Sequence, residues 1–228
     1  MAIAATAELR RDTWVIGLIS TAHGFSHFFQ LVLPPLFPLL KDVLGVSYQA
    51  LGLLTMVFYA TSCIAQPAAG FLVDRFGARY VLLAGLALFA GATALMGVVP
   101  SFALLFPLAA LAGLGNSVFH PADFAILNAQ IGDKRLGRAY SFHAIAGNIG
   151  WALAPVASVG LAAALGWRTA LITMGAVGLA LTAFLAMREE LHEQEHAARA
   201  REAQRGLGFA ANVRTLLALA ILTCFAYF

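Results

Sequence analysis

The chain has 228 residues, of which 61% are hydrophobic and 11% are charged, and its formal net charge is +3. A soluble domain carries roughly 25% charged residues, so this composition excludes an ordinary soluble domain and predicts a protein that folds in lipid. The basic residues lie in short clusters between apolar runs, a pattern typical of membrane topology signals and not of a nucleic-acid surface. Both cysteines, Cys63 and Cys224, lie inside apolar runs, so we expect neither a disulfide nor a cysteine metal site.

Six apolar runs are long enough to cross a bilayer, whose hydrocarbon core of about 30 Å needs about 20 helical residues. The predicted spans lie at about 13–40, 48–73, 79–99, 102–131, 137–164 and 167–187. A seventh apolar run begins near Asn212, and the sequence stops inside it at Phe228. We therefore expect an all-α membrane protein with an N-terminal segment (1–12), a six-helix bundle (13–188), a central linker (189–211) and a partial seventh helix (212–228).

The basic residues predict the orientation of the bundle. Twelve of the fourteen lysines and arginines fall on one side of the predicted topology, and only Lys41 and Arg168 fall on the other. Since the cytoplasmic side carries the excess of positive charge, the N-terminus and the central linker are predicted to be cytoplasmic. The expected location is the plasma or inner membrane, with the protein crossing it several times.

Polar side chains are concentrated in four of the six spans. In chain order they are Ser20, His23, His27 and Gln30; Thr55, Tyr59, Ser62 and Gln66; Asn116, His120 and Asp123; and Ser141, His143 and Asn148. After Arg79 and Arg168 near their starts, the third and sixth spans contain nothing more polar than tyrosine or threonine, so we interpret them as lipid-facing supports. The pattern of two polar spans and one apolar span occurs twice, which predicts the 3+3 internal repeat of secondary transporters.

The fourth span contains the least expected stretch, NSVFHPADFAIL at 116–127. Pro121 removes a backbone donor, so a helix here must bend. Asp123 is costly in a low-dielectric setting unless it is paired or protonated, and it lies three residues after His120 on the same helical face. Ionisable residues inside a membrane are functional by default, so we expect this pair to be functional.

The loop between the second and third spans reads GFLVDRFGARYVLL, residues 70–83. It resembles the signature loop of the major facilitator superfamily, with matches at Gly70, Leu72, Asp74, Arg75 and Gly77. Ala78 replaces the first of the usual two basic residues, and Arg79 keeps the second. The resemblance implies a cytoplasmic gate loop, in which Asp74 and the arginines latch one helical bundle to another.

Four of the spans also resemble the fosmidomycin-resistance-type subgroup of drug-efflux carriers. The matching stretches are HGFSHFFQLVLPPLFPLL, LGLLTMVFYATSCIAQP, GLGNSVFHPADFAIL and GRAYSFHAIAGNIGWALAP. The fifth-span antiporter motif is weakened to Gly150, Ala154 and Pro155, and the antiporter arginine of the fourth span is replaced by Ala109. The resemblance implies a partner half of six more helices.

The sequence thus predicts a transporter that is not an enzyme and needs no cofactor or metal. We expect Asp123 and His120, joined by His143, to carry the coupling proton, because histidine titrates near neutral pH. The residues expected to contact substrate or water are His23, His27, Gln30, Tyr59 and Asn116. The expected partners are the lipid bilayer, a small organic substrate, protons and the missing six-helix half, with no nucleic acid.

Proton-coupled efflux of a small organic molecule is the favoured function, and proton-coupled uptake of a small organic solute is the first alternative. Two other classes remain open from the sequence. One is a membrane protein that binds a metal or haem through its histidines. The other is a binding or regulatory protein that works without a second bundle.

Overall fold

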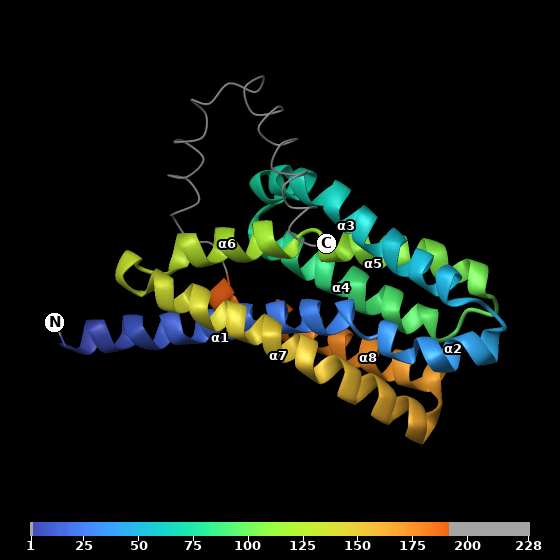
Figure 1. Ribbon diagram of the computed structural model, residues 1–228. Helices are drawn as coiled ribbons and strands as arrows, with labels where there is room; N and C mark the ends of the chain where they lie inside the picture. The colour runs from blue at the N-terminus through green and yellow to red at the C-terminus, as the bar shows by residue number, and fades with distance from the viewer. Residues whose placement is uncertain (1, 192–228) are drawn as a thin grey trace.

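The computed structural model describes residues 2–191, with side chains from residue 8 onward, and all regular structure in that range is helical (Figure 1). In chain order the helices are α1 (Ala2–Gln30), η1 (Pro34–Leu36), α2 (Phe37–Leu44), α3 (Tyr48–Phe76), α4 (Ala78–Met96), η2 (Phe102–Leu104), α5 (Leu105–Asn116), α6 (Phe119–Gln130), α7 (Asp133–Leu165), α8 (Trp167–Ala186) and η3 (Glu189–Leu191).

Six helical stretches are long and apolar enough to span a membrane, which confirms the six predicted spans. They are Glu8–Leu44, Tyr48–Phe76, Ala78–Met96, Phe102–Gln130, Asp133–Leu165 and Trp167–Ala186. The helix of the first span extends back through the predicted N-terminal segment, because α1 begins at Ala2. Most of the predicted linker and the partial seventh helix lie outside the described residues.

Two of the six spans are interrupted, and prolines explain both breaks. The first span leaves the α-helical form after Gln30, because Pro34 and Pro35 lack the N–H groups that would continue it. The fourth span breaks between α5 and α6, one turn before Pro121. Pro121 has no N–H to donate to the carbonyl oxygen of Ser117, four residues earlier, and its ring would collide with that carbonyl in a straight helix. The predicted bend is therefore present, and it separates Asn116 from Asp123.

The spans pack beside neighbours that come from different parts of the sequence, with α1 and α7 parallel, α3 and α5 parallel, and α4 and α8 antiparallel. α1 lies beside α7, α4 beside α8, and α3 beside α5 (Figure 1). Glycines allow these close approaches, as in other membrane bundles. A Cβ atom at Gly150 of α7 would collide with the carbonyl oxygen of Gly24 of α1, and one at Gly24 would lie 3.0 Å from the carbonyl oxygen of Ala146.

The third span is not the lipid-facing support that its apolar sequence predicted. Leu82, Leu86 and Phe89 of α4 are at most 1% exposed, because α4 packs against both α5 and α8. A Cβ atom at Gly85 would come within 2.8 Å of the carbonyl oxygen of Gly115, so the backbones of α4 and α5 are in contact. The apolar side chains of α4 form much of the protein core, and a sequence cannot separate that role from contact with lipid.

An arginine closes one end of the α4–α8 pair. Arg79, at the start of α4, donates from Nη2 to the carbonyl oxygens of Ala186 (2.5 Å) and Arg188 (3.3 Å) at the C-terminal end of α8. The last carbonyls of a helix have no partner within that helix, and a cation beside them is favourable. Arg79 therefore caps a helix to which it does not belong.

Arg168 does the same at the opposite end of the pair. It lies at the start of α8 and donates from Nη1 to the carbonyl oxygens of Gly97 (3.2 Å) and Val99 (2.7 Å), at the C-terminal end of α4. Both helices follow a glycine in the left-handed region, Gly77 at φ +89° and Gly166 at φ +81°. The third and sixth spans thus begin and end alike, which is the 3+3 repeat seen at the level of single residues.

Candidate functional site

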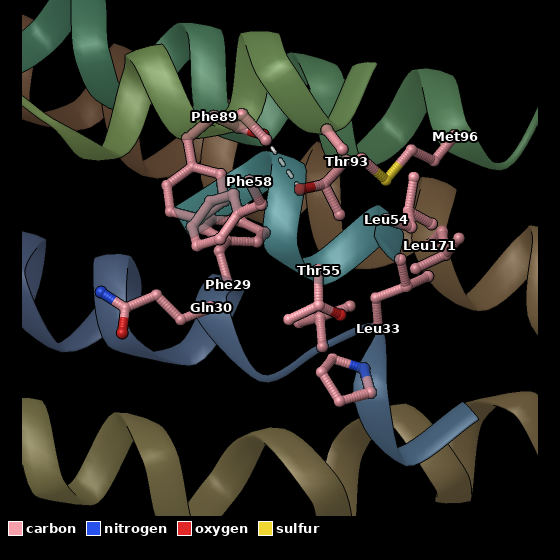
Figure 2. Close-up of a pocket in the computed structure, with 14 residues that line it drawn as sticks. Phe29, Gln30, Leu33, Leu54, Thr55, Phe58, Phe89, Thr93, Met96 and Leu171 are labelled. Carbon is pink, nitrogen blue, oxygen red and sulfur yellow. Dashed lines mark hydrogen bonds between the residues drawn. The ribbon is translucent and has the colours of Figure 1, made fainter. Parts of the chain in front are cut away.

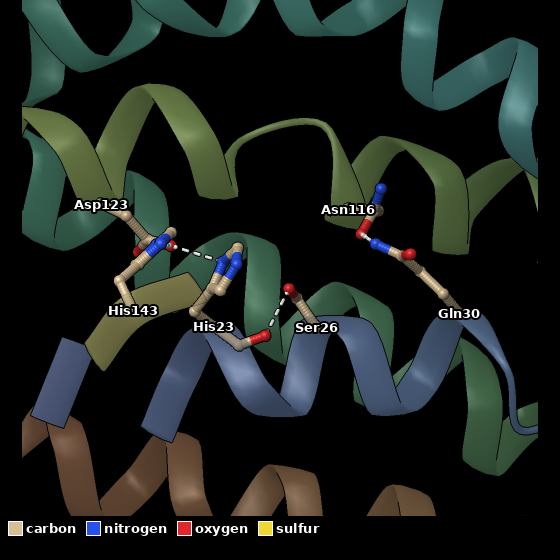
Figure 3. Close-up of polar contacts among 6 residues, drawn as sticks. All are labelled: His23, Ser26, Gln30, Asn116, Asp123 and His143. Atoms are coloured by element: carbon tan, nitrogen blue, oxygen red, sulfur yellow. Dashed lines mark hydrogen bonds and ion pairs between the residues drawn. The ribbon is translucent and has the colours of Figure 1, made fainter. Parts of the chain in front are cut away.

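The candidate site is centred on Asp123, the one Asp, Glu, Lys or Arg that lies away from the ends of the six spans. Its side chain lies on α6 and is 0% exposed. One carboxylate oxygen, Oδ2, lies 3.2 Å from Nδ1 of His23 on α1 and 3.0 Å from Nε2 of His143 on α7 (Figure 3). Each imidazole donates a hydrogen bond in the tautomer that carries its proton on that nitrogen. Three separate spans therefore meet at a single carboxylate oxygen.

The two imidazoles that bind Asp123 are also stacked on each other. The ring centroids of His23 and His143 are 3.5 Å apart and the ring planes differ by 22°. Both side chains are buried, at 3% and 4% exposure. The two rings share one acceptor oxygen and are in contact with each other, so a charge on one ring acts directly on the other.

Two further histidines surround this pair. The His27 ring lies 4.3 Å from that of His23, and the His120 ring lies 5.3 Å from it, measured between centroids. We call His23, His27, His120, His143 and Asp123 together the histidine cluster. Neither ring nitrogen of His27 has a hydrogen-bond partner among residues 8–191, nor does the second oxygen of Asp123, Oδ1.

A glycine makes room for the cluster. A Cβ atom at Gly147 of α7 would lie 2.9 Å from the His27 ring and 3.1 Å from Nε2 of His23. Real Cβ atoms rarely approach other atoms so closely, so any larger residue here would push the rings away. Gly147 therefore allows α7 to support two imidazoles of α1.

A chain of amide hydrogen bonds continues from the cluster along α1. The Trp151 indole N–H donates to Oε1 of Gln30 (3.0 Å), and Nε2 of Gln30 donates to Oδ1 of Asn116 (3.1 Å; Figure 3). Nδ2 of Asn116 then donates to the Ser62 hydroxyl (2.7 Å). These hydrogen bonds join α7, α1, α5 and α3. Asn116, which takes part in two of them, is the last residue of α5 before the break in the fourth span.

The structure brings together most of the residues predicted from the sequence, but in different pairs. Asp123 pairs with His23 and His143 across the bundle, whereas the sequence suggested His120 on its own helix. His120 instead contributes its ring next to His23. Tyr59 lies on α3 with its ring against Phe58, 4.9 Å between centroids.

Trp151 was missed by the sequence reasoning. Its ring lies 4.3 Å from that of His27, and its side chain is 36% exposed. The spacing of His143, Gly147 and Trp151, four residues apart, places all three on one face of a helix and was the available signal.

The gate-loop residues have different environments in the structure, some exposed and some buried. Asp74 and Arg75 are exposed at the end of α3, and Arg75 lies over the Phe76 ring, 5.4 Å from its centroid. Asp74 has no ion-pair partner in the described part of the chain. Arg79 is buried and caps α8, as described above. Gly77 supplies the turn between α3 and α4, and a Cβ atom added at Gly70 would have nothing within 4 Å.

The fifth-span residues lie at the contact with α1. Gly150 faces Gly24, Ala154 is completely buried, and Pro155 lies inside α7 without interrupting it. At the start of α7, Arg135 donates from Nε to Oδ2 of the buried Asp12 on α1 (2.6 Å). This end of the α1–α7 pair is thereby fixed by an ion pair that no sequence motif indicated.

A small cavity lies further along α1, away from the histidine cluster. Figure 2 shows Gln30 at one edge, with Phe29, Phe58 and Phe89 beside it and Thr55 across the space. Its volume is about 40 Å³, and a water molecule occupies about 30 Å³ of liquid. A cavity of this volume is large enough to hold water.

Three residues of the cluster also have the donor set of a metal site. One ligand atom each from His23, His143 and Asp123 lies within 4.8 Å of the other two. Imidazole and carboxylate groups are ligands that Zn²⁺ accepts. In this structure the three are joined by hydrogen bonds, and the absence of a metal or cofactor stays a prediction.

A bundle of six apolar helices with a polar site shared between spans is an architecture found in membrane-embedded secondary carriers. The sequence pattern described as Major Facilitator Superfamily matches residues 19–228, and the chain belongs to that superfamily.

Relatives and solved structures agree with this assignment. The Fosmidomycin resistance protein of Escherichia coli (strain K12) is 28% identical over 155 residues, covering 68% of this chain and 38% of that protein. The Probable L-galactonate transporter of the same organism is 30% identical over 142 residues, covering 62% of this chain and 31% of that protein. The matching part of the chain thus spans 31–38% of the length of these relatives.

The fold is shared with a bacterial homologue of the human lysosomal transporter Spinster, solved in an inward-facing and unoccupied conformation. The TM-score is 0.69 at 17% identity, covering 81% of this chain and 44% of that one.

Proposed function

We propose that the complete protein is a secondary transporter that exports a small organic molecule by alternating access, in exchange for protons. The observation that carries the proposal is the buried Asp123 carboxylate, which His23 and His143 hold from two other spans. Membership of the superfamily and the similarity to the Fosmidomycin resistance protein support a transport function for the whole molecule.

The coupling step follows from the cost of a buried charge. With neutral imidazoles the cluster has a net charge of −1, which is unfavourable in a low-dielectric interior. A proton taken up by the cluster removes this charge. It therefore changes the free energy of exposing the cluster to either side of the membrane. The break between α5 and α6 places the carboxylate on a short helical segment, a feature common at binding sites of secondary transporters.

The residues proposed to contact substrate are His27, Gln30, Tyr59, Asn116 and Trp151. His27 has both ring nitrogens open to a further hydrogen bond, and Trp151 covers it with a partly exposed ring. We propose that His120, on α6, and His143, on α7, stabilise the proton after the cluster has taken it up.

Asp74 and Arg75 are proposed to latch the cytoplasmic side by contacting the second half of the transporter. Both side chains are exposed at the end of α3, which leaves them accessible to another bundle. Arg79 is engaged within this half and would hold the loop in place. In the proposed topology the N-terminus and the 189–211 segment are cytoplasmic, and the membrane is the plasma or inner membrane.

The second candidate is proton-coupled uptake of a small organic solute. The similarity to the Probable L-galactonate transporter favours it, because that protein's name assigns it a sugar acid. Both candidates use the same proton site and differ in the direction of substrate movement.

Transport by the complete protein in liposomes tests the proposal. Liposomes with an acidic or an alkaline interior are supplied with fosmidomycin or L-galactonate, with and without a protonophore. We expect an acidic interior to drive the probe inward, against outward proton flow, and the protonophore to abolish the accumulation. Accumulation only in an alkaline interior would support uptake, and accumulation unaffected by the protonophore would contradict proton coupling.

A further inference from the structure

We infer that the histidine cluster takes up a single proton in each transport cycle, and that the stacked pair His23 and His143 sets this limit. The inference rests on the proposed proton coupling and adds its stoichiometry. It follows from the charges in the spans and from the distances between the five groups.

The charge balance permits one proton. Asp123 is the one Asp, Glu, Lys or Arg that lies away from the ends of the six spans, so with neutral imidazoles the unloaded cluster has a net charge of −1. The groups that surround the carboxylate are imidazoles from α1, α6 and α7. One proton brings the cluster to neutrality, whereas a second would leave a cation without a counter-ion in the interior, which is strongly unfavourable.

No imidazole of the cluster is far enough from the others to carry a second positive charge without repulsion. His23 and His143 share Oδ2 of Asp123 and stack at 3.5 Å, so two imidazolium rings would repel each other at contact distance. His120 is 6.4 Å from both His27 and His143, and His27 is 4.3 Å from His23. Because every imidazole is this close to another, a positive charge on one ring raises the free-energy cost of a second positive charge anywhere in the cluster.

The proton has a defined route of exchange within the cluster. It arrives from water, and a ring-nitrogen lone pair of His23 or His143 or the open oxygen Oδ1 of Asp123 accepts it. The hydrogen bonds to Oδ2 allow the three groups to share the added charge. On the other side of the membrane the same proton returns to water, and the cluster regains its charge of −1.

The arrangement makes the two stacked imidazoles partly redundant. If His143 is removed, His23 and Asp123 still form a pair that can accept one proton. If the histidines titrated independently, each removal would lower the number of protons transported. The number of protons per substrate in variants therefore distinguishes the two possibilities.

The experiment is a zero-flux measurement on the complete protein in liposomes. The membrane potential and the pH gradient are varied until net movement of the probe, fosmidomycin or L-galactonate, stops, which gives the ratio of protons to substrate. We expect His143→Gln to transport more slowly with an unchanged ratio, and His27→Gln to leave the ratio unchanged as well. A ratio that falls by one in His143→Gln would overturn the inference.

The Asp123→Asn variant separates this inference from the proposed function. We expect it to lose one proton from the ratio, and a loss of two would contradict the limit while leaving proton coupling intact. An unchanged ratio would remove the cluster from the coupling mechanism altogether. If Asp123→Asn does not transport the probe at all, the result for His143→Gln still decides the inference.

Discussion

Arg79 and Arg168 hold equivalent positions in the two repeats of the bundle, and each caps the helix that the other begins. Arg79 donates to carbonyl oxygens at the C-terminal end of α8, and Arg168 donates to those at the C-terminal end of α4. Since the two helices are antiparallel, one arginine closes each end of the pair. The unit formed by α4 and α8 is therefore fixed at both ends, while the polar site lies on the other spans.

Replacing either arginine by glutamine should destabilise the bundle by about 1.5–3 kcal/mol, because a hydrogen bond to a charged donor contributes about that much. The measurement is thermal unfolding of the purified complete protein in detergent. The two sites lie about 28 Å apart, from the length of a 19-residue helix, so the effects of Arg79→Gln and Arg168→Gln should add. Unchanged unfolding temperatures in both variants would contradict the capping role.

Gly147→Ala should disturb the site without removing any polar group. The added Cβ atom would press on the rings of His23 and His27, so we expect a loss of about 1–3 kcal/mol of stability and a marked loss of transport rate. Gly160→Ala is the matched control, because Gly160 lies on the same helix with nothing within 4 Å of its Cβ position. Equal effects of the two substitutions would show that the histidine cluster does not depend on this glycine.

Asn116→Ala should break the amide hydrogen-bond chain at its centre. Gln30 and Ser62 would lose their partner in a buried environment, and a buried polar group without a partner costs about 1–3 kcal/mol. The control is Asn148→Ala, at an exposed position on α7. An unfolding temperature that falls equally in both variants, or in neither, would contradict a structural role for these hydrogen bonds.

The sequence predicted the spans well because length and composition determine whether a helix can cross a membrane. It also predicted which spans carry the polar site and where the fourth span bends. It did not predict the role of α4, since leucine and phenylalanine are equally suited to lipid and to a protein core. The burial of α4 depends on small residues of neighbouring helices, such as Gly115, which a pattern within one span does not reveal.

The pairs within the site were beyond the sequence for a related reason. Spacing along a helix brings His120 and Asp123 to one face, and it suggested that they bind each other. The packing of α1 and α7 instead brings His23 and His143 to the carboxylate from residues 100 and 20 positions away. Likewise the signature loop suggested a latch for Arg79, whereas the antiparallel packing of α4 and α8 gives it a helix end to cap.

The most direct test of proton coupling compares Asp123→Asn with wild type in liposomes of the complete protein. Asp42→Asn, at an exposed acid outside the cluster, serves as the control. We predict that a pH gradient drives accumulation of the probe by wild type and by Asp42→Asn. Asp123→Asn should still equilibrate the probe but should not accumulate it. Full gradient-driven accumulation by Asp123→Asn would contradict the assignment of the coupling proton to the histidine cluster.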